Sequence, residues 1–197
     1  MILNVNHWYN MNRILIVAAL PQEVPNFHWP LPSTLIFTGV GKVNATYKLT
    51  NVLTKVYGKE RFDLVINYGT AASKVYNGIV DCTKFIQRDM DATPLGFKKG
   101  ETPFESEPSM VDFSHIKNPI ALNLTCYTGD TFATDLTPFD DVVDMEAYAL
   151  AKTCRNFDID FVSYKYITDD GNPEDWENFH AEGIEEFKKV LEYYDNI

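Results

Sequence analysis

Apolar runs of strand length recur along this chain, and each ends in a turn of polar or glycine residues. The apolar residues within a run are continuous rather than alternating, which is typical of strands buried on both faces of a sheet. The six runs are residues 14–20, 34–38, 63–67, 79–86, 120–127 and 161–167. A sheet buried on both faces needs helices on both sides, so this pattern restricts the chain to the α/β class.

Helical spacing of apolar residues appears in three other segments, namely 43–56, 145–157 and 174–194. Gly58 follows the first of them and supplies a stop signal. Strands that alternate with helices predict a mainly parallel sheet, and ligands bind such sheets beyond the carboxyl ends of the strands. The segments expected at that edge are 20–23, 39–42, 69–73, 129–132 and 168–170.

A length of 197 residues is enough for one domain whose core needs no disulfide or metal to hold it together. We expect a single domain over residues 13–197, preceded by a lead of residues 1–12. Met11 is an alternative start, which would make residues 1–10 dispensable.

Charge and cysteine usage exclude several classes of protein. The chain has 17 Lys and Arg against 28 Asp and Glu, a net charge of -11 that argues against binding to nucleic acid. Cys82, Cys126 and Cys154 are far apart and show no metal-type or disulfide-type spacing, so we expect reduced thiols, a cytoplasmic location and no metal site. No apolar run is long enough to span a membrane, and the run at 14–20 is too short for a signal peptide.

Three segments leave more than one interpretation of their structure or function open. Residues 39–42 (Gly-Val-Gly-Lys) lack the spacing of a nucleotide phosphate loop, and we interpret them as a tight strand-to-helix turn that can also shape a small-ligand site. Residues 67–72 (Asn-Tyr-Gly-Thr-Ala-Ala) read as a strand that enters a small-residue turn, with or without a ligand. The long irregular stretch 87–118 is expected to be functional, interfacial or mobile.

Four acidic residues are candidates for chemistry. Two of them, Glu23 and Asp169, lie where the strand-end rule expects a ligand, and the other two lie just as a helix begins. Glu23 is either a general base or a favourable charge at the start of a helix. Asp169 is either a proton donor with a raised pKa or part of a turn. Asp144 and Glu146 flank Met145, a pattern that suits the hydroxyls and the apolar face of a sugar, although one carboxylate there is ordinary helix capping.

Taken in order, these motifs resemble the purine nucleoside phosphorylase-like superfamily, and within it the 5′-methylthioadenosine/S-adenosylhomocysteine nucleosidases. The matching segments are 14–24, 38–45, 67–72, 88–97, 129–132, 143–147 and 167–169. The resemblance implies a three-layer αβα fold with a mixed, mainly parallel central sheet. It also implies a hydrolase that cleaves the N-glycosidic bond of an adenine nucleoside, works without a cofactor and forms a homodimer.

The resemblance also implies a role for individual residues. Glu23 would activate water, and Asp169 would protonate the adenine leaving group. The sugar and base would contact the remaining site residues, which are Thr70, Ala71, Phe132, Ala133, Asp144, Met145, Glu146 and Thr168. Leu95 and Phe97 would line the 5′-alkylthio pocket of a partner subunit.

Two alternative functions stay open at this point. One is a phosphate-dependent phosphorylase or a nucleosidase for another purine nucleoside. Of these, the phosphorylase would need arginine at the phosphate. Arginine is scarce, and only Arg88 is expected near a strand end or from a partner. An inactive module that only binds nucleosides is the third possibility, and the presence of Glu23, Glu146 and Asp169 weighs against it.

The chain departs from the family pattern in three places. Asp144 stands where the ribose motif has Glu, and Lys165 stands where the family has Arg, so we expect an altered salt bridge behind the site. Residues 106–118 replace a helix that normally packs beside the sheet, which affects the expected dimer contact and the 5′-side of the pocket.

Overall fold

The computed structural model describes residues 13–25, 34–56 and 61–195. The expected lead of residues 1–12 lies outside the described residues. The elements in chain order are β1 (Ile14–Ala18), η2 (Pro21–Glu23), β2 (Thr34–Phe37), α1 (Lys42–Val56), β3 (Leu64–Ala72), β4 (Gly78–Gln87), η3 (Thr93–Leu95), β5 (Met110–Asp112), β6 (Leu124–Thr128), β7 (Val142–Asp144), α2 (Ala147–Asn156), β8 (Asp160–Asp169), α3 (Pro173–Phe179) and α4 (Ile184–Tyr194). The predicted α/β class with a mixed sheet is confirmed.

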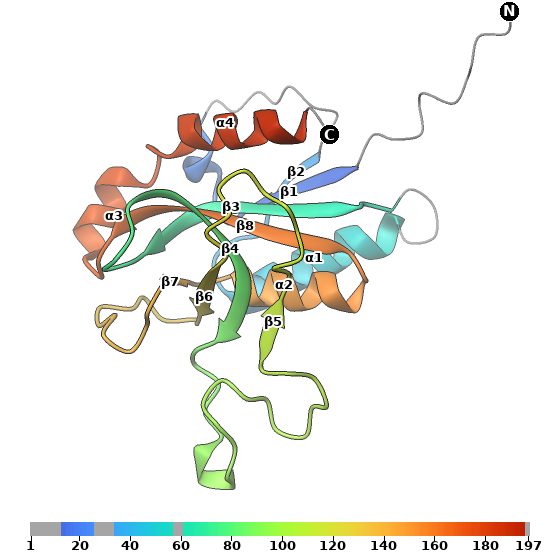
Figure 1. Cartoon of the computed structure of the whole chain (residues 1–197), viewed down its shortest axis with the longest axis vertical. Coiled ribbons are helices and arrows are strands. Elements are labelled where there is room, and N and C mark those ends of the chain that lie inside the picture. The colour runs from blue at the N-terminus through green and yellow to red at the C-terminus, as the bar shows by residue number, and fades with distance from the viewer. Residues whose placement is uncertain (1–12, 26–33, 57–60, 196–197) are drawn as a thin grey trace, which may run out of the picture.

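The strands pair into one mixed sheet in which five of them close a ring (Figure 1). β3 pairs with β8, β8 with β4, β4 with β6, and β6 with β7. The ring closes through a single antiparallel pair between Ala72 of β3 and Val143 of β7. β1 and β2 extend the sheet from β3, and β5 extends it from β4. The closure brings the ends of β3, β7 and β8 close together.

Helices pack on opposite faces of the sheet (Figure 1). One apolar cluster joins the sheet to α1 and α2 and includes Leu49, Leu53 and Leu150. The other lies under α4, where the Phe187 ring stacks on Tyr68 at 4.2 Å between centroids. Because the strands contribute buried residues to both clusters, their sequences are continuously apolar.

The sequence predicted one helix over 174–194, and the structure has two. Residues 180–183 interrupt it, and Gly183 explains the break. A Cβ atom on Gly183 would lie 2.3 Å from the Tyr166 ring, so the chain approaches β8 too closely for any side chain at this position. α3 and α4 therefore have separate directions, and only α4 buries apolar residues against the sheet.

Residues 67–72 are also different from the predicted turn. They form the second half of β3 and pair with β8 along their whole length, with a shift of register between Ala71 and Ala72. Such irregularities bend a strand and redirect its side chains, and they are frequent beside active sites. The short strands β5 and β7 were not predicted, because three residues are too few to show periodicity.

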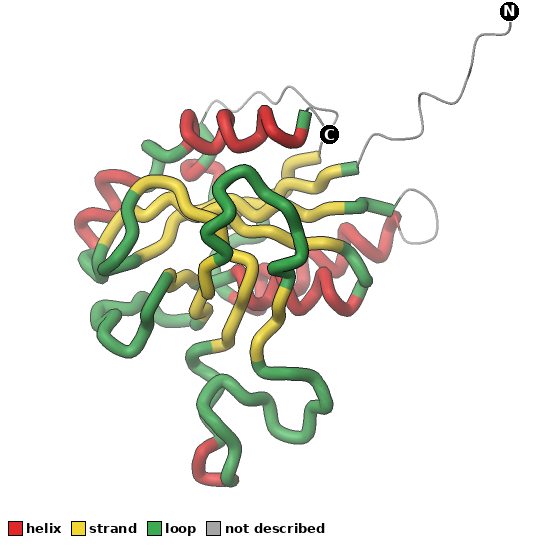
Figure 2. Tube along the Cα trace, in the orientation of Figure 1, coloured by secondary structure: helices red, strands yellow, loops and turns green. Residues whose placement is uncertain are grey.

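Residues 88–109, which we call the arm, project away from the sheet as loops with a single short helical turn (Figure 2). At its base, Lys42 of α1 forms ion pairs with Asp89 of the arm and with Asp130. On the return path, Glu105 and Glu107 pair with Lys152 and Arg155 of α2. The arm is therefore tied to both helices of one face.

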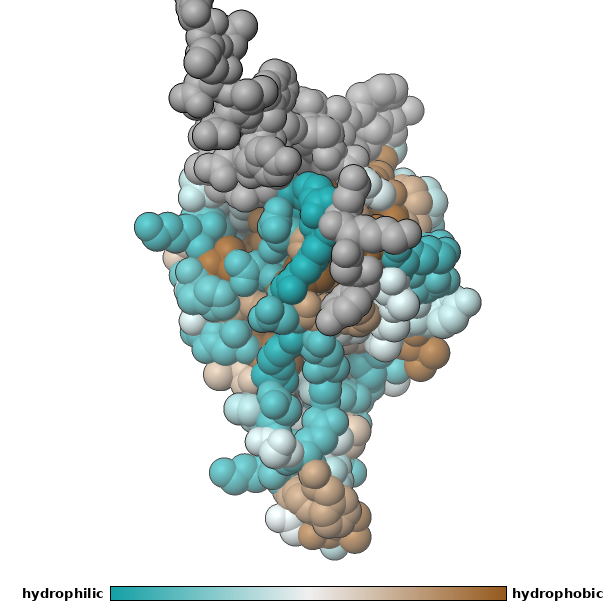
Figure 3. All heavy atoms as spheres, turned by 90° about the vertical axis from the view of Figure 1, so that its right-hand side faces the viewer, coloured by the Kyte–Doolittle hydropathy of each residue, from teal (hydrophilic) through white to brown (hydrophobic). Residues whose placement is uncertain are grey.

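Apolar side chains gather at the tip of the arm (Figure 3). Leu95 is 70% exposed and Phe104 is 91% exposed, and the Phe97 and Phe104 rings meet edge to face. Within the described residues no helix is long and apolar enough to cross a membrane. An exposed apolar tip on a charged chain is typical of a surface that contacts another protein.

Candidate active site

A cavity of about 210 Å³ lies at the carboxyl ends of β1, β3, β7 and β8, where the strand-end rule places a ligand. Most of its lining residues were predicted from the sequence. The lining consists of Ala19, Leu20, Glu23, Val40, Thr70, Ala71, Ala72, Thr131, Phe132, Ala133, Val143, Asp144, Met145, Glu146, Asp169 and Trp176. Four of these are buried carboxylates in different surroundings, namely Glu23, Asp144, Glu146 and Asp169. Different surroundings are how a protein separates the roles of chemically similar groups.

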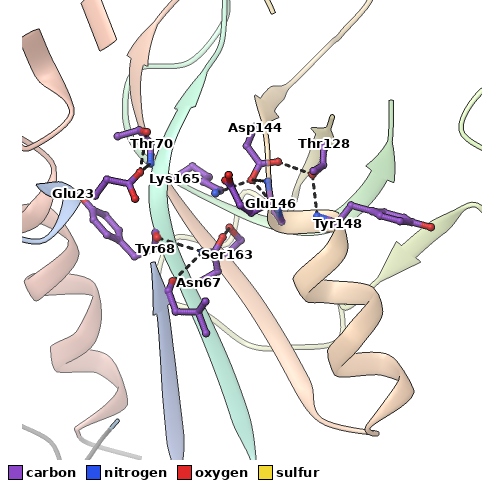
Figure 4. A network of polar contacts seen from close by, with 12 residues as sticks. Glu23, Asn67, Tyr68, Thr70, Thr128, Asp144, Glu146, Tyr148, Ser163 and Lys165 are labelled. Atoms are coloured by element: carbon purple, nitrogen blue, oxygen red, sulfur yellow. Dashed lines mark hydrogen bonds and ion pairs between the residues drawn. The ribbon is translucent and has the colours of Figure 1, made fainter. Parts of the chain in front are cut away.

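Glu23 is presented by the short η2 helix that follows β1, and it is only 3% exposed. Its Oε1 accepts hydrogen bonds from the backbone N–H and the hydroxyl of Thr70, both at 3.0 Å, and its Oε2 accepts from the N–H of Leu20 at 2.9 Å (Figure 4). A carboxylate held by three donors has a fixed orientation.

Asp169 ends β8 and is 7% exposed. Its Oδ2 accepts from the Thr168 hydroxyl at 2.8 Å, and its Oδ1 accepts from the Gly171 N–H at 2.9 Å. Burial raises the pKa of Asp169 above its ordinary value despite these two hydrogen bonds, which act in the opposite direction. Thr168 is not part of the cavity lining, and its contact is with the Asp169 carboxyl rather than with the cavity.

Glu146 lies at the start of α2 and receives the backbone N–H of Gly41 on its Oε1 at 2.8 Å. The predicted strand-to-helix turn at 39–42 therefore contributes an amide to the site. Burial and the neighbouring Asp144 charge raise the pKa of Glu146 to about 8. A carboxyl group in this state can both donate and accept hydrogen bonds, which suits the hydroxyls of a sugar.

Asp144 lies beside the cavity, but its carboxylate is already occupied. Its Oδ2 is 2.8 Å from Lys165 Nζ and accepts the Ala147 N–H, while its Oδ1 accepts the Thr128 hydroxyl (Figure 4). The pair with Lys165 is buried, with side chains at most 1% exposed. Asp144, the last residue of β7, thus binds an amide at the start of α2 and connects this helix to β8. Its pair with Lys165 is the expected altered salt bridge behind the site.

Gly69 of β3 lets two charged groups approach the same side of the strand. A Cβ atom at this position would lie 3.3 Å from Glu23 Oε1 and 3.4 Å from Lys165 Nζ. Burial lowers the pKa of Lys165, but Asp144 outweighs it, so the net shift is upward and the ammonium stays charged. A fixed positive charge therefore lies behind the carboxylates of the cavity.

The apolar part of the lining comes from predicted residues and from one that the sequence reasoning missed. Ala71, Phe132, Ala133 and Met145 face the cavity. Trp176 of α3 also lines it, and its indole N–H donates to the Thr70 hydroxyl at 2.9 Å. Its place seven residues after Asp169, on a short helix beyond the last strand, is the only signal that would have pointed to it.

Leu95 and Phe97, predicted for a partner's pocket, are on the arm and do not line this cavity. Arg88 follows β4 at the strand end, as expected, but its guanidinium donates to Thr131 and to the Gly129 carbonyl and lies over the Phe139 ring. Within the described part of the chain, no arginine lines the cavity.

Comparisons with known proteins agree with this geometry. The sequence model of the Phosphorylase superfamily matches residues 130–194. A 5′-methylthioadenosine/S-adenosylhomocysteine nucleosidase of Hydrogenovibrio crunogenus is 33% identical over 158 residues, which cover 68% of this chain and 66% of the relative. The chain belongs to the phosphorylase superfamily. A nucleosidase of the same name from an Exiguobacterium strain is 29% identical, with 84% of this chain and 82% of the relative covered.

Solved structures of this superfamily share the fold. A mutant nucleosidase of Helicobacter pylori with 5′-methylthioadenosine in its active site has a TM-score of 0.75 at 16% identity, over 94% of this chain and 98% of the other. A nucleosidase of Colwellia psychrerythraea in complex with adenine has a TM-score of 0.72 at 19% identity, over 94% and 95%. At these identities the likeness establishes the fold.

The buried pair of Lys165 and Asp144 yields a prediction about stability. Removing one partner of a buried ion pair leaves an unpaired buried charge, so Lys165→Met should lower the free energy of unfolding by about 3–5 kcal/mol. The double variant Asp144→Asn/Lys165→Met leaves no unpaired charge and should lose less. Urea unfolding at pH 7 measures both, and a Lys165→Met protein as stable as the wild type would contradict the prediction.

Proposed function

We propose that this protein hydrolyses the N-glycosidic bond of adenine nucleosides such as 5′-methylthioadenosine or S-adenosylhomocysteine and releases adenine. The observation that carries the proposal is that one cavity brings together the buried carboxylates of Glu23, Glu146 and Asp169, each held by different donors. The names of the relatives agree with this reaction. The proposal includes a single domain over residues 13–197 in three layers, a cytoplasmic location and no metal or cofactor.

On the base side of the bond, Asp169 is the proposed acid. Adenine leaves poorly as an anion, so a proton must reach N7 as the bond breaks. The raised pKa of Asp169 keeps this carboxyl protonated at higher pH than an ordinary aspartate, which suits a donor. In this proposal Phe132 stacks on the purine, the backbone of Ala133 reads its edge, and Thr168 orients the acid through its hydrogen bond.

On the opposite face of the sugar, Glu23 is the proposed base. As the glycosidic bond breaks, positive charge develops on the ribosyl group, and water attacks the anomeric carbon. Glu23 accepts the proton of that water and orients it, while Thr70 and Ala71 form the adjoining wall. Glu146 holds the ribose hydroxyls and Met145 packs on the sugar. We assign Asp144 the role of holding Lys165 and the start of α2, because its own oxygens are occupied.

Hydrolysis is favoured over phosphorolysis by the composition of the cavity wall. A phosphate dianion needs cationic donors, usually arginine. The described cavity lining contains no arginine, and the guanidinium of Arg88 is bound to backbone and side-chain oxygens of the 129–131 loop. The third possibility, a module that only binds nucleosides, would not need an acid and a base held on separate sides of the cavity.

Product analysis tests the proposed reaction directly. Purified protein incubated with 5′-methylthioadenosine should release free adenine at the same rate with and without phosphate, and the sugar product should be the free 5-methylthioribose. Chromatography of the products measures this. 5-Methylthioribose-1-phosphate as the sugar product would identify a phosphorylase instead, and tight binding without product would identify an inactive module.

The pH dependence tests the acid. Because the pKa of Asp169 is raised, activity should persist below that raised pKa and fall as the pH increases through it. Asp169→Asn should lower kcat by about 100-fold or more without changing the urea midpoint, since general acid catalysis contributes about 10²–10⁴-fold. The pKa of Glu146 is raised to about 8, so Glu146→Gln is the matched control, and it should keep the falling limb. A falling limb that disappears in Glu146→Gln would contradict the assignment.

We also propose a homodimer formed through the face that carries α1, α2 and the arm. A groove of about 560 Å³ is lined by residues of α1 and α2, and Val43 and Tyr47 at its edge are 78% and 71% exposed. The apolar tip of the arm lies outside its own cavity, so Leu95 and Phe97 are placed to reach a partner. A second copy would bury both apolar surfaces.

Charge placed on this face should separate the subunits. Val43→Glu/Tyr47→Glu introduces four like charges per dimer into a contact that would otherwise exclude water, and both positions are exposed in the single chain. Sedimentation velocity should show a dimer for the wild type and a monomer for the variant, with a raised KM for methylthioadenosine. A wild-type monomer, or a variant that stays dimeric, would contradict this interface.

A further inference from the structure

Trp176 is linked to the proposed base Glu23 by two hydrogen bonds that meet at the hydroxyl of Thr70. Its indole N–H donates to the Thr70 hydroxyl oxygen at 2.9 Å, and that hydroxyl lies 3.0 Å from Glu23 Oε1. The three side chains come from η2, β3 and α3, which are far apart in the sequence. All three line the same cavity.

The chemistry of the indole group decides the direction of this chain of hydrogen bonds. An indole N–H donates and cannot accept, so the Thr70 oxygen must be its acceptor. The single proton of the Thr70 hydroxyl is then free to point at Glu23 Oε1, and the carboxylate accepts it. Without Trp176, the same hydroxyl would be free to rotate its proton toward another acceptor or toward water.

We propose that Trp176 is a positioning residue that fixes the Thr70 hydroxyl as a donor to Glu23 and thereby holds the water-activating carboxylate in one orientation. This inference rests on the proposed function, because it assigns Trp176 a part in the same reaction. Trp176 acts through Thr70 rather than on the reacting atoms.

The local structure supports a fixed position for the indole ring. α3 begins four residues after Asp169, with Asn172 as its cap and Pro173 in its first turn. The Trp176 ring stacks on His180 one turn later, at 5.2 Å between centroids. The part of the chain that carries the proposed acid therefore continues directly into the helix that orients the proposed base.

A double-mutant cycle separates action through Thr70 from a direct effect on the substrate. Trp176→Phe keeps an aromatic ring but removes the donor, and it should lower kcat by about 3–10-fold with little change in KM. Thr70→Val removes the relay and should lower kcat by about 10–100-fold, while Thr70→Ser, which keeps the hydroxyl, should restore most of it. In the Thr70→Val background, Trp176→Phe should cost nothing further.

The outcomes of the cycle are distinct. Glu177→Gln, an exposed position on the same helix, is the matched control and should behave as the wild type. Trp176→Phe with unchanged kcat would overturn the proposal. An equal loss of kcat in the Thr70→Val background would also overturn it, because Trp176 would then act on the substrate directly.

A readout independent of turnover separates this inference from the proposed function. The three tryptophans of the chain give three indole N–H proton resonances in NMR spectra, and Trp176→Phe identifies the one that belongs to Trp176. In Thr70→Val that resonance should move upfield and exchange with water faster, whereas in Thr70→Ser it should not. An unchanged resonance in Thr70→Val would overturn the inference, while wild-type protein that releases no adenine would overturn the proposed function alone.

Discussion

The buried ion pair between Lys165 and Asp144 is the interaction on which the arrangement of the site depends. It joins β8 to the start of α2, next to the single residue pair through which the ring of strands closes. A buried charge is costly unless it is paired, so this pair holds the ends of β7 and β8 together rather than adding much net stability. Glu146 follows Asp144 by two residues and Asp169 follows Lys165 by four. The pair therefore also sets the spacing between the proposed sugar-binding and acid residues.

Much of the site could be predicted because parallel strands bring their carboxyl ends to one edge. Glu23, Glu146 and Asp169 each follow or end a strand, Thr70 lies two residues before the end of β3, and the structure brings all four to one cavity. The family resemblance supplied their proposed roles, while the residues alone left a structural alternative for each. The fold class was also accessible, because continuous apolar runs that alternate with helical patterns have few other solutions.

The remaining features depend on contacts between distant segments, which a single sequence does not show. Trp176 looked like one apolar position on an amphipathic helix, and only the packing of α3 against β8 brings its N–H to Thr70 of β3. The break between α3 and α4 follows from the closeness of Gly183 to the Tyr166 ring, which requires knowledge of the packing. Asp144 appeared equivalent to Glu146 in the sequence, and the neighbouring Lys165 ammonium distinguishes them.

The same ammonium also helps to explain how four carboxylates coexist in a small cavity. Asp144 takes the direct contact with Lys165, and this contact lowers the pKa of Asp144, so its negative charge persists close to Glu146 and helps to raise the pKa of Glu146. Glu23 is held instead by neutral donors, Thr70 and the Leu20 amide, and Asp169 by a hydroxyl and one amide. The donors around the four groups therefore differ, which is how related side chains can serve as base, acid and sugar ligand in one site. Relative to the family pattern that the sequence resembles, Asp144 stands in place of Glu and Lys165 in place of Arg. Both side chains of the pair are therefore shorter, and they still meet at 2.8 Å.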